Sequence, residues 1–205
     1  MRKAIRRIMA VMVAFSLVFT GVYVLPAEVQ AKTVSVKGTY HQTDARKMLK
    51  KINKFRTGDD AWYYTSEGSD DKTVLKDLSK FKYDYTLEKI AMKRAAEIAV
   101  SFSHTRPNGS DCFSCYPDGY MWKGENIAYG QDSVNSVMND WKETNEPYSG
   151  QGHRRNMLSE NFTCIGIACF EYNGMKYWVQ EFGSPTINTE KTKACDKTKT
   201  VKVKS

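Results

Sequence analysis

The sequence predicts an α+β domain in which helices enclose a late antiparallel hairpin. Several segments place apolar residues three and four positions apart, which is the spacing of an amphipathic helix. Two strand-like segments, residues 163–172 and 175–182, flank the dipeptide Asn173-Gly174. Asn-Gly is the strongest short hairpin signal because both residues tolerate the left-handed backbone of a two-residue turn. The 205 residues suit one such domain with an appendage.

Residues 1–31 have the three-part layout of a secretory signal peptide. Four positive charges within residues 1–7 precede an uncharged run over residues 8–25, and the segment ends in Val-Gln-Ala. Small residues at these last positions predict cleavage after Ala31 and export of the rest, so we expect a secreted, extracellular protein. The alternative is a retained membrane anchor, because a run of this length just spans a bilayer.

Four helices are expected in the body of the chain. The first begins at Thr43 and ends near Gly58, with an apolar face formed by Met48, Leu49, Ile52 and Phe55. The second follows Asp84, with Thr86 as its expected cap, and its buried stripe comprises Leu87, Ile90, Ala91, Arg94, Ala95 and Ile98. Ser133 is the expected cap of the third, and residues 152–158 form a short fourth helix. Residues 124–130, bounded by glycines, are expected to be a strand or a tight functional turn.

The two ends of the exported chain are expected to lie outside the domain, which spans residues 43–185. Residues 32–42 are an extended lead-in, and residues 186–205 a basic, disordered tail. Six lysines crowd the last fifteen residues, opposed only by Asp196. Such a tail would attract an anionic cell wall or membrane surface, or it serves only for solubility. Nucleic acid is not an expected partner, because no basic motif is interleaved with stacking aromatic residues.

Polar residues that could form a site are few, since the chain has three histidines. His41 lies in the polar lead-in and is expected to have no functional role. His104 and His153 lie beside glycine-containing turns, where functional side chains are common. Glu125 lies between Gly124 and Asn126, just before apolar residues, so its carboxylate needs a partner to offset desolvation.

Four motifs in order along the chain resemble the CAP superfamily, which includes the cysteine-rich secretory, antigen 5 and pathogenesis-related 1 proteins. They are SHTRPNG at residues 103–109, GENIA at 124–128, Trp141 followed by GHRRNML at 152–158, and YWVQEFG at 177–183. The resemblance runs from about residue 44 to residue 184, most of the exported chain. It implies the SCP-domain fold, a three-layer α-β-α sandwich with a central antiparallel sheet and an open cleft.

The resemblance also implies a set of cleft residues. His104 and His153 match the two histidines that can hold a divalent metal, often zinc, and Glu125 matches the first of two acids. At the family's position for the second acid this chain has Thr144. Glu143 is one residue away and Glu146 is two residues away, so Glu143 is preferred.

The chemistry of this set leaves three functions open. Two imidazoles bind Zn²⁺ with carboxylate or water completing the shell, but catalytic zinc usually has three protein ligands, so we expect weak binding. A secreted, non-catalytic protein whose cleft binds metal or another extracellular ligand is therefore preferred. The alternative is a metal-dependent hydrolase of peptide or cell-wall material, with Glu125 as the base for a metal-bound water and Glu143 as the weaker catalytic candidate. A lipid or sterol carrier, as in some eukaryotic relatives, has least support.

The five cysteines leave their pairing open. Cys112 and Cys115 form a Cys-x-x-Cys motif, Cys164 and Cys169 lie on one expected strand, and Cys195 lies in the tail. Export favours at least one structural disulfide, while a cysteine metal site and a redox pair are weaker alternatives. Cys164 and Cys169 cannot bridge each other, because five residues of strand span roughly 16 Å.

Overall fold

The computed structural model describes residues 32–205. The predicted signal peptide, residues 1–31, lies outside the described residues, so neither the cleaved leader nor the retained anchor is tested. Within residues 32–205, no helix combines the length and apolar character that crossing a bilayer requires.

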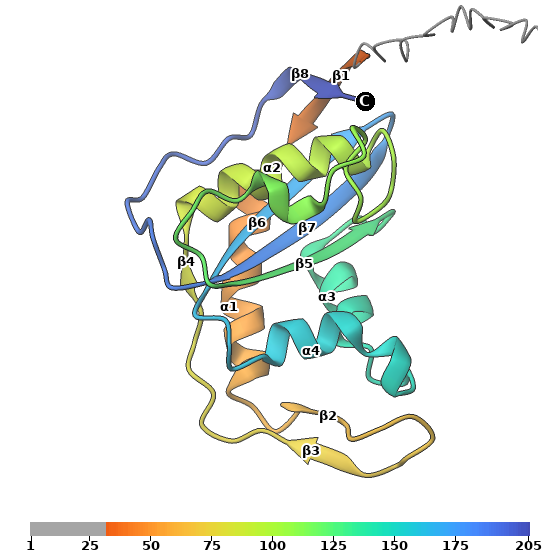
Figure 1. Ribbon diagram of the computed structural model, residues 1–205, viewed down its shortest axis with the longest axis vertical. Coiled ribbons are helices and arrows are strands. Elements are labelled where there is room, and N and C mark those ends of the chain that lie inside the picture. Colours follow the sequence, from red (N-terminus) through yellow and green to blue (C-terminus); the bar gives the residue numbers. More distant parts are fainter. Residues whose placement is uncertain (1–31) are drawn as a thin grey trace, which may run out of the picture. The chain divides into compact units, whose positions relative to one another are not determined.

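A central sheet of six strands organises the described chain (Figure 1). Its main strands follow the order β5 (Trp122–Tyr129), β7 (Met175–Ser184), β6 (Cys164–Tyr172), β1 (Thr33–Tyr40) and β8 (Thr198–Lys204). Neighbours along this path are antiparallel, and the short β4 (Lys82–Tyr83) pairs with β6 in parallel. A separate small sheet joins β2 (Trp62–Tyr64) to β3 (Lys72–Val74).

Helices cover both faces of this sheet. Buried side chains of α2 (Tyr85–Ile98) pack on one face, against Ala168, Phe170 and Val179. On the other face α1 (Gln42–Arg56), α3 (Val134–Lys142) and α4 (Gly152–Leu158) share a core with Ile165, Ile167 and Trp178. Alternate residues of a strand point to opposite faces, so β6 serves both cores at once. The fold is the expected α+β sandwich with a central antiparallel sheet.

Two local details of this packing follow from the sequence. The predicted hairpin is confirmed: Asn173 and Gly174 join β6 to β7 with φ angles of 52° and 76°. Gly166 of β6 lets α2 approach closely, since a Cβ there would lie 2.1 Å from the backbone of Leu87 and Glu88.

The two ends of the domain correct the sequence-based expectation. The lead-in at residues 32–42 contains β1, and the tail predicted to be disordered contains β8, which pairs with β1 from Thr33↔Lys204 to Thr39↔Thr198. Among the lysines of the tail, valines recur at every second position, which is the pattern of a strand with one buried face. Val201 and Val203 of β8 pack on the same core as Val34 and Val36 of β1, so the ribbon buries one apolar face.

The observed N-cap residues of the helices confirm one predicted cap and correct two others. Ser133 caps α3 through a capping box with Ser136, as expected. Thr43 lies inside α1, and its hydroxyl donates to Asp196. Asp84, rather than Thr86, caps α2. Its Oδ1 accepts the backbone N–H groups of Thr86 (2.8 Å) and Leu87 (3.2 Å), and its Oδ2 accepts those of Ile187 (2.7 Å) and Asn188 (3.1 Å).

Replacing this carboxylate should weaken the whole domain. We expect Asp84→Ala to lower the free energy of unfolding by about 3 kcal/mol, because a helix cap and two buried charge-assisted hydrogen bonds are lost together. Thr86→Ala, which removes the other candidate cap, should change it by less than about 0.5 kcal/mol. Urea denaturation of both variants checks the prediction, and equal effects would contradict it.

Candidate functional site

The four side chains predicted to form a site line one cleft of about 450 Å³. His104 comes from the loop after α2, Glu125 from β5, Glu143 from the residue after α3, and His153 from α4. The rest of the lining comprises Asn126, Ser149, Gly150, Gly152, Arg155 and Asn156. The fold therefore brings together residues that are far apart in the sequence.

One half of the cleft is the pair of His104 and Glu125. Nδ1 of His104 lies 2.7 Å from Oε1 of Glu125. The imidazole side chain is 59% exposed, whereas that of the glutamate is 1% exposed. Burial alone would raise the pKa of Glu125, but hydrogen bonds from His104 and Arg94 outweigh burial and lower it. Glu125 is therefore an ionised carboxylate at the base of the cleft, and it orients the exposed imidazole.

The other half repeats this arrangement with His153 and Glu143. Nδ1 of His153 is hydrogen-bonded to Oε1 of Glu143, and Oε2 of Glu143 accepts the backbone N–H of Arg154 at 3.0 Å. Glu143 has a left-handed backbone, with φ 47°, which turns its side chain back toward α4 after α3 ends. Of Glu143, Thr144 and Glu146, only Glu143 is among the cleft-lining residues.

A chain of side-chain amides joins the two halves. Nδ2 of Asn156 donates to Oδ1 of Asn126 at 2.8 Å, and Nδ2 of Asn126 donates to the carbonyl oxygen of His153 at 3.2 Å. Asn126 is the residue after Glu125, and its amide also donates to Gln180 at 2.9 Å. These bonds fix α4, and hence His153, against the strand that carries Glu125.

Behind the first pair lies a buried ion network centred on Arg94. Its guanidinium donates to Oε2 of Glu125 at 2.6 Å, to Glu97 at 2.9 Å and to the carbonyl oxygen of Ser103 at 2.7 Å. Glu97 also accepts from Arg106 at 2.7 Å. Arg94 is fully buried, so it links α2 to β5 and to the loop that carries His104.

A second arginine, Arg154, supports the other pair. It is fully buried, and its guanidinium donates to the carbonyl oxygens of Trp62, Asp60 (2.6 Å) and Lys142 (2.5 Å). Burial lowers the pKa of Arg154 to about 10, so the side chain stays charged at neutral pH. Arg154 is therefore part of the core that supports α4 and does not line the cleft.

Below Glu125 lies a second carboxyl group, on Glu181 of β7. The two residues face each other across β5 and β7, and Glu181 is fully buried. Burial, together with the charge of Glu125, raises the pKa of Glu181 well above its usual value. The neutral form of Glu181 is therefore favoured beside the ionised Glu125, and its Oε2 accepts the hydroxyl of Tyr116 at 2.8 Å.

Cys112 adds a thiol beside the first pair. Ligand atoms of His104, Cys112 and Glu125 lie within 4.8 Å of one another, a possible metal-binding group that does not include His153. Burial raises the pKa of Cys112 to about 12, so it is a protonated thiol at neutral pH. All five cysteines are free thiols in the structure, and Cys164 and Cys169 pack in the cores on opposite faces of the sheet.

Sequence reasoning missed most of this supporting layer, although one signal was available. Arg94 stands within an apolar helical stripe, and a charge in that position requires a buried partner. The pairing of Glu181 with Glu125 depends on strand register and had no comparable signal. His41 lies apart from the cleft-lining residues and bonds to Glu171 at 2.9 Å.

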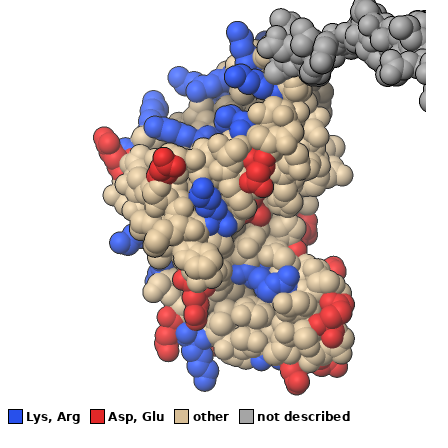
Figure 2. All heavy atoms as spheres, viewed as in Figure 1, with Lys and Arg blue, Asp and Glu red and all other residues tan. Residues whose placement is uncertain are grey.

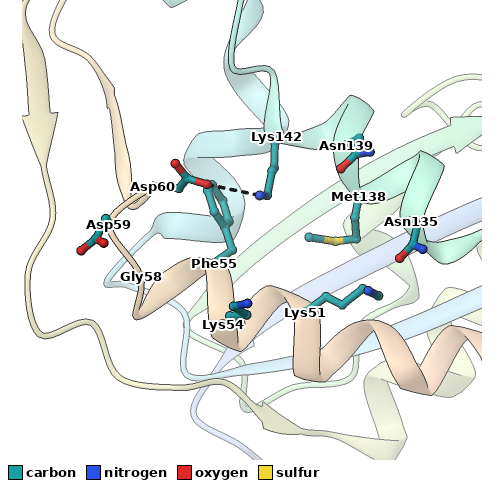
Figure 3. A pocket seen from close by; sticks show the side chains of 10 residues that line it. All are labelled: Lys51, Lys54, Phe55, Gly58, Asp59, Asp60, Asn135, Met138, Asn139 and Lys142. Carbon is teal, nitrogen blue, oxygen red and sulfur yellow. Dashed lines mark hydrogen bonds and ion pairs between the residues drawn. The ribbon is translucent and has the colours of Figure 1, made fainter.

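A larger hollow lies elsewhere, between α1 and α3 (Figure 3). It measures about 630 Å³ and is lined by Lys51, Lys54, Phe55, Gly58, Asp59, Asp60, Asn135, Met138, Asn139 and Lys142. Nζ of Lys142 reaches Asp60 at 3.4 Å across its rim. The carboxylate of this ion pair is 68% exposed, whereas the smaller cleft holds two histidine–glutamate pairs whose carboxylates are almost fully buried, so the smaller cleft remains the candidate site.

Comparison with known proteins identifies the family to which this fold and its paired His–Glu cleft belong. The profile of the cysteine-rich secretory protein family, CAP, matches residues 49–182. The chain belongs to this family. A curated relative, the uncharacterized protein YkwD of Bacillus subtilis, is 33% identical over 110 residues. That match covers 51% of this chain and 40% of the relative, so less than half of the relative's length is represented.

Solved structures share the fold at low sequence identity. An outer surface protein from Borrelia burgdorferi matches with a TM-score of 0.53 and 20% identity, over 71% of this chain and 97% of its own. An extracellular protein containing an SCP domain from Bacillus anthracis matches with a TM-score of 0.50 and 22% identity, over 70% of this chain and 41% of its own. NaASP2, crystallised with Zn²⁺, matches with a TM-score of 0.50 and 20% identity, over 73% of this chain and 84% of its own.

The buried network predicts a large effect of removing its arginine. Arg94→Met should lower the free energy of unfolding by about 3–5 kcal/mol, because Glu125 and Glu97 lose a buried counter-ion. Lys93→Met, at the neighbouring position on α2, is the control and should have little effect. Guanidinium denaturation at neutral pH checks this. A loss for Arg94→Met no larger than that of the control would contradict the network.

The same network sets a pH dependence. Burial alone would raise the pKa of Glu97, but hydrogen bonds from Arg106 and Arg94 hold it below its usual value of 4.5. A lowered folded-state pKa stabilises the fold above pH 4.5, and this stability is lost as the pH falls through the folded-state value. In Arg94→Met the decrease in the free energy of unfolding on acidification should be smaller than in the wild-type protein, because one of the two hydrogen-bonding partners of Glu97 is gone. Urea denaturation across this pH range measures it.

Proposed function

We propose that this protein is a secreted CAP protein whose cleft binds a divalent metal, zinc in the first instance, through Nε2 of His104 and Nε2 of His153. The observation that carries the proposal is the matching environment of the two imidazoles. Each is bonded through Nδ1 to a carboxylate, Glu125 or Glu143. A histidine that donates from Nδ1 keeps the Nε2 lone pair available, and metal-binding histidines usually have such a carboxylate partner.

Donor chemistry favours this pair over the group of His104, Cys112 and Glu125. The Cys112 thiol would have to lose a proton that its pKa of about 12 retains. Glu125 is already neutralised by Arg94 at 2.6 Å, and a metal ion on its oxygen would lie close to that guanidinium. Imidazole nitrogen is a common zinc ligand, and the two histidines are more exposed than the two glutamates that bond to them. NaASP2, a structural relative, was crystallised with Zn²⁺.

We infer a positioning role for the two glutamates rather than a catalytic one. A general base must reach the proton that it accepts, yet Glu125 is 1% exposed and both of its oxygens are bonded to Arg94 or His104. Glu143 is 9% exposed and bonds to His153 and to a backbone N–H. This arrangement supports binding over hydrolysis of peptide or cell-wall material.

Zinc should stabilise the folded protein through the two histidines. At a free zinc concentration 100 times Kd, the added free energy of unfolding is about 2.7 kcal/mol, which appears as a rise in Tm. The double variant His104→Ala, His153→Ala should lose this rise, while Cys112→Ser and His41→Ala keep it. Glu143→Gln should keep the site with zinc affinity roughly 10–100-fold weaker, since that loss follows removal of a carboxylate that orients a ligand.

Differential scanning fluorimetry with added zinc, and calorimetric titration, measure these effects. A rise that survives in the double histidine variant but disappears in Cys112→Ser would transfer the site to the cysteine-containing group. Turnover of a peptide or glycan panel with zinc that disappears in Glu125→Gln but survives in His41→Ala would establish the hydrolase instead.

We further propose that the ribbon of β1 and β8 binds an anionic wall polymer. Alternation places the polar residues of both strands on one face: Thr33, Ser35, Lys37, Thr39, Thr198, Thr200, Lys202 and Lys204. Basic side chains gather over the end of the molecule where Figure 1 places β1 and β8 (Figure 2). The face carries hydroxyl and ammonium donors without an apolar side chain that could insert into a membrane, which favours a phosphate-bearing polymer.

Neutralising the lysines of this face should weaken polyanion binding. With linear polyphosphate as the probe, Lys37→Gln, Lys202→Gln, Lys204→Gln together should raise Kd about 100-fold at low salt, at about 1 kcal/mol per lysine. The same charge change at Lys50, Lys54 and Lys80, near α1, is the control and should have less than about a tenth of that effect. Equal losses in both triple variants would show that only net charge matters. Binding to anionic lipid vesicles but not to polyphosphate would favour a membrane surface.

A further inference from the structure

The Cys-x-x-Cys motif forms one turn of 3₁₀ helix, Cys112–Cys115, in the loop between α2 and β5. Asp111 starts this turn, since its carboxylate accepts the backbone N–H of Phe113 at 2.7 Å. The backbone N–H groups of Ser114 and Tyr116 donate three residues back, to the carbonyl oxygens of Asp111 and Phe113, each at 3.0 Å. The turn is thus fixed by its own hydrogen bonds.

This backbone brings the two thiols onto one side. A 3₁₀ helix has three residues per turn and rises about 2.0 Å per residue, so residues three apart are eclipsed, with Cα atoms about 6 Å apart. Disulfides join residues whose Cα atoms are roughly 4.4–6.8 Å apart. Cys112 and Cys115 meet this condition, whereas Cys164 and Cys169 lie in different cores on opposite faces of β6.

The surroundings suit a disulfide. Cys112 is 4% exposed, and Cys115 packs partly buried against the cluster that contains Leu87 and Ile90 of α2. Ser114, between them, is exposed, which indicates that the turn presents its sulfur-bearing side to the protein. Burial raises the pKa of both thiols, so their exchange with a small disulfide is slow at neutral pH. That environment fits a structural bridge rather than a redox catalyst.

We propose that Cys112 and Cys115 form an intrachain disulfide when the folded protein meets a small-molecule disulfide such as oxidised glutathione. The sulfur of Cys115, the more exposed of the two, attacks the small disulfide, forms a mixed disulfide and releases one thiol. The sulfur of Cys112 then displaces the second thiol and closes the bridge. Two protein thiols are oxidised, one small disulfide is reduced to two thiols, and the two protein protons leave with them.

The bridge would lie behind the cleft. It closes the turn just before Tyr116, whose hydroxyl donates to Glu181 (2.8 Å) and to the carbonyl oxygen of Phe182 (2.9 Å). It also removes the Cys112 thiol from the group with His104 and Glu125. The proposal does not rest on zinc binding. If the two histidines hold zinc, affinity should be the same in the oxidised and reduced proteins.

Mass spectrometry tests the bridge directly. The folded protein is incubated with oxidised glutathione, freed of it, then unfolded in guanidinium with iodoacetamide and digested. We expect the peptide that contains Cys112 and Cys115 to lack both alkyl groups and two hydrogens. Cys164→Ser should leave this result unchanged. In Cys112→Ser the mixed disulfide cannot be resolved, so Cys115 should retain glutathione. In Cys115→Ser the attacking thiol is absent, so the buried Cys112 should be alkylated.

The contrary result is equally clear. Full alkylation of both Cys112 and Cys115 in the wild-type protein, glutathione retained on either, or a bridge from either to Cys195 would overturn the proposal. Because the readout is made on the unmodified sequence, a variant that fails to fold does not affect the conclusion.

Discussion

The buried contact between Arg94 and Glu125 is the interaction on which the cleft depends. It joins the helix on one face of the sheet to the edge strand β5, and it places an ionised carboxylate directly below an exposed imidazole. Isolated buried charges are costly, so the group persists only because several partners share it, among them Glu97 and the carbonyl oxygen of Ser103. The position of His104 is therefore set by the core as well as by the loop that carries it.

In the second half of the cleft, a buried arginine again lies behind a histidine–glutamate pair. Arg154 is buried behind the pair of His153 and Glu143, and its guanidinium donates to three backbone carbonyl oxygens. Each imidazole thus has a carboxylate beside it and a buried guanidinium supporting the segment that carries that carboxylate. A cleft built in this way is pre-organised for a ligand at its surface, while its charged groups are already satisfied from within.

Much of this arrangement was predictable from sequence, and the parts that were not have identifiable reasons. Asn173-Gly174 fixed the hairpin because its turn chemistry is local, and the cap at Ser133 was predicted on the same basis. The motifs located the histidines and Glu125. The prediction of disorder for residues 198–204 is wrong, although their composition is basic. Lysines alternate with valines there, and the segment becomes a strand because it pairs with β1, which is distant in the chain. The contact between Glu181 and Glu125 likewise depends on register between β5 and β7, which a single sequence does not specify.

The pairing of β1 with β8 also has a consequence for biosynthesis. Thr33 lies opposite Lys204, so the first strand of the described domain must wait for the last one before its backbone groups are satisfied. While the polypeptide is still emerging from a ribosome or a translocation channel, β1 presents an open hydrogen-bonding edge with its valines uncovered. Until residues 198–204 have been synthesised and can pair with β1, that open edge is available to chaperones and to other copies of the chain.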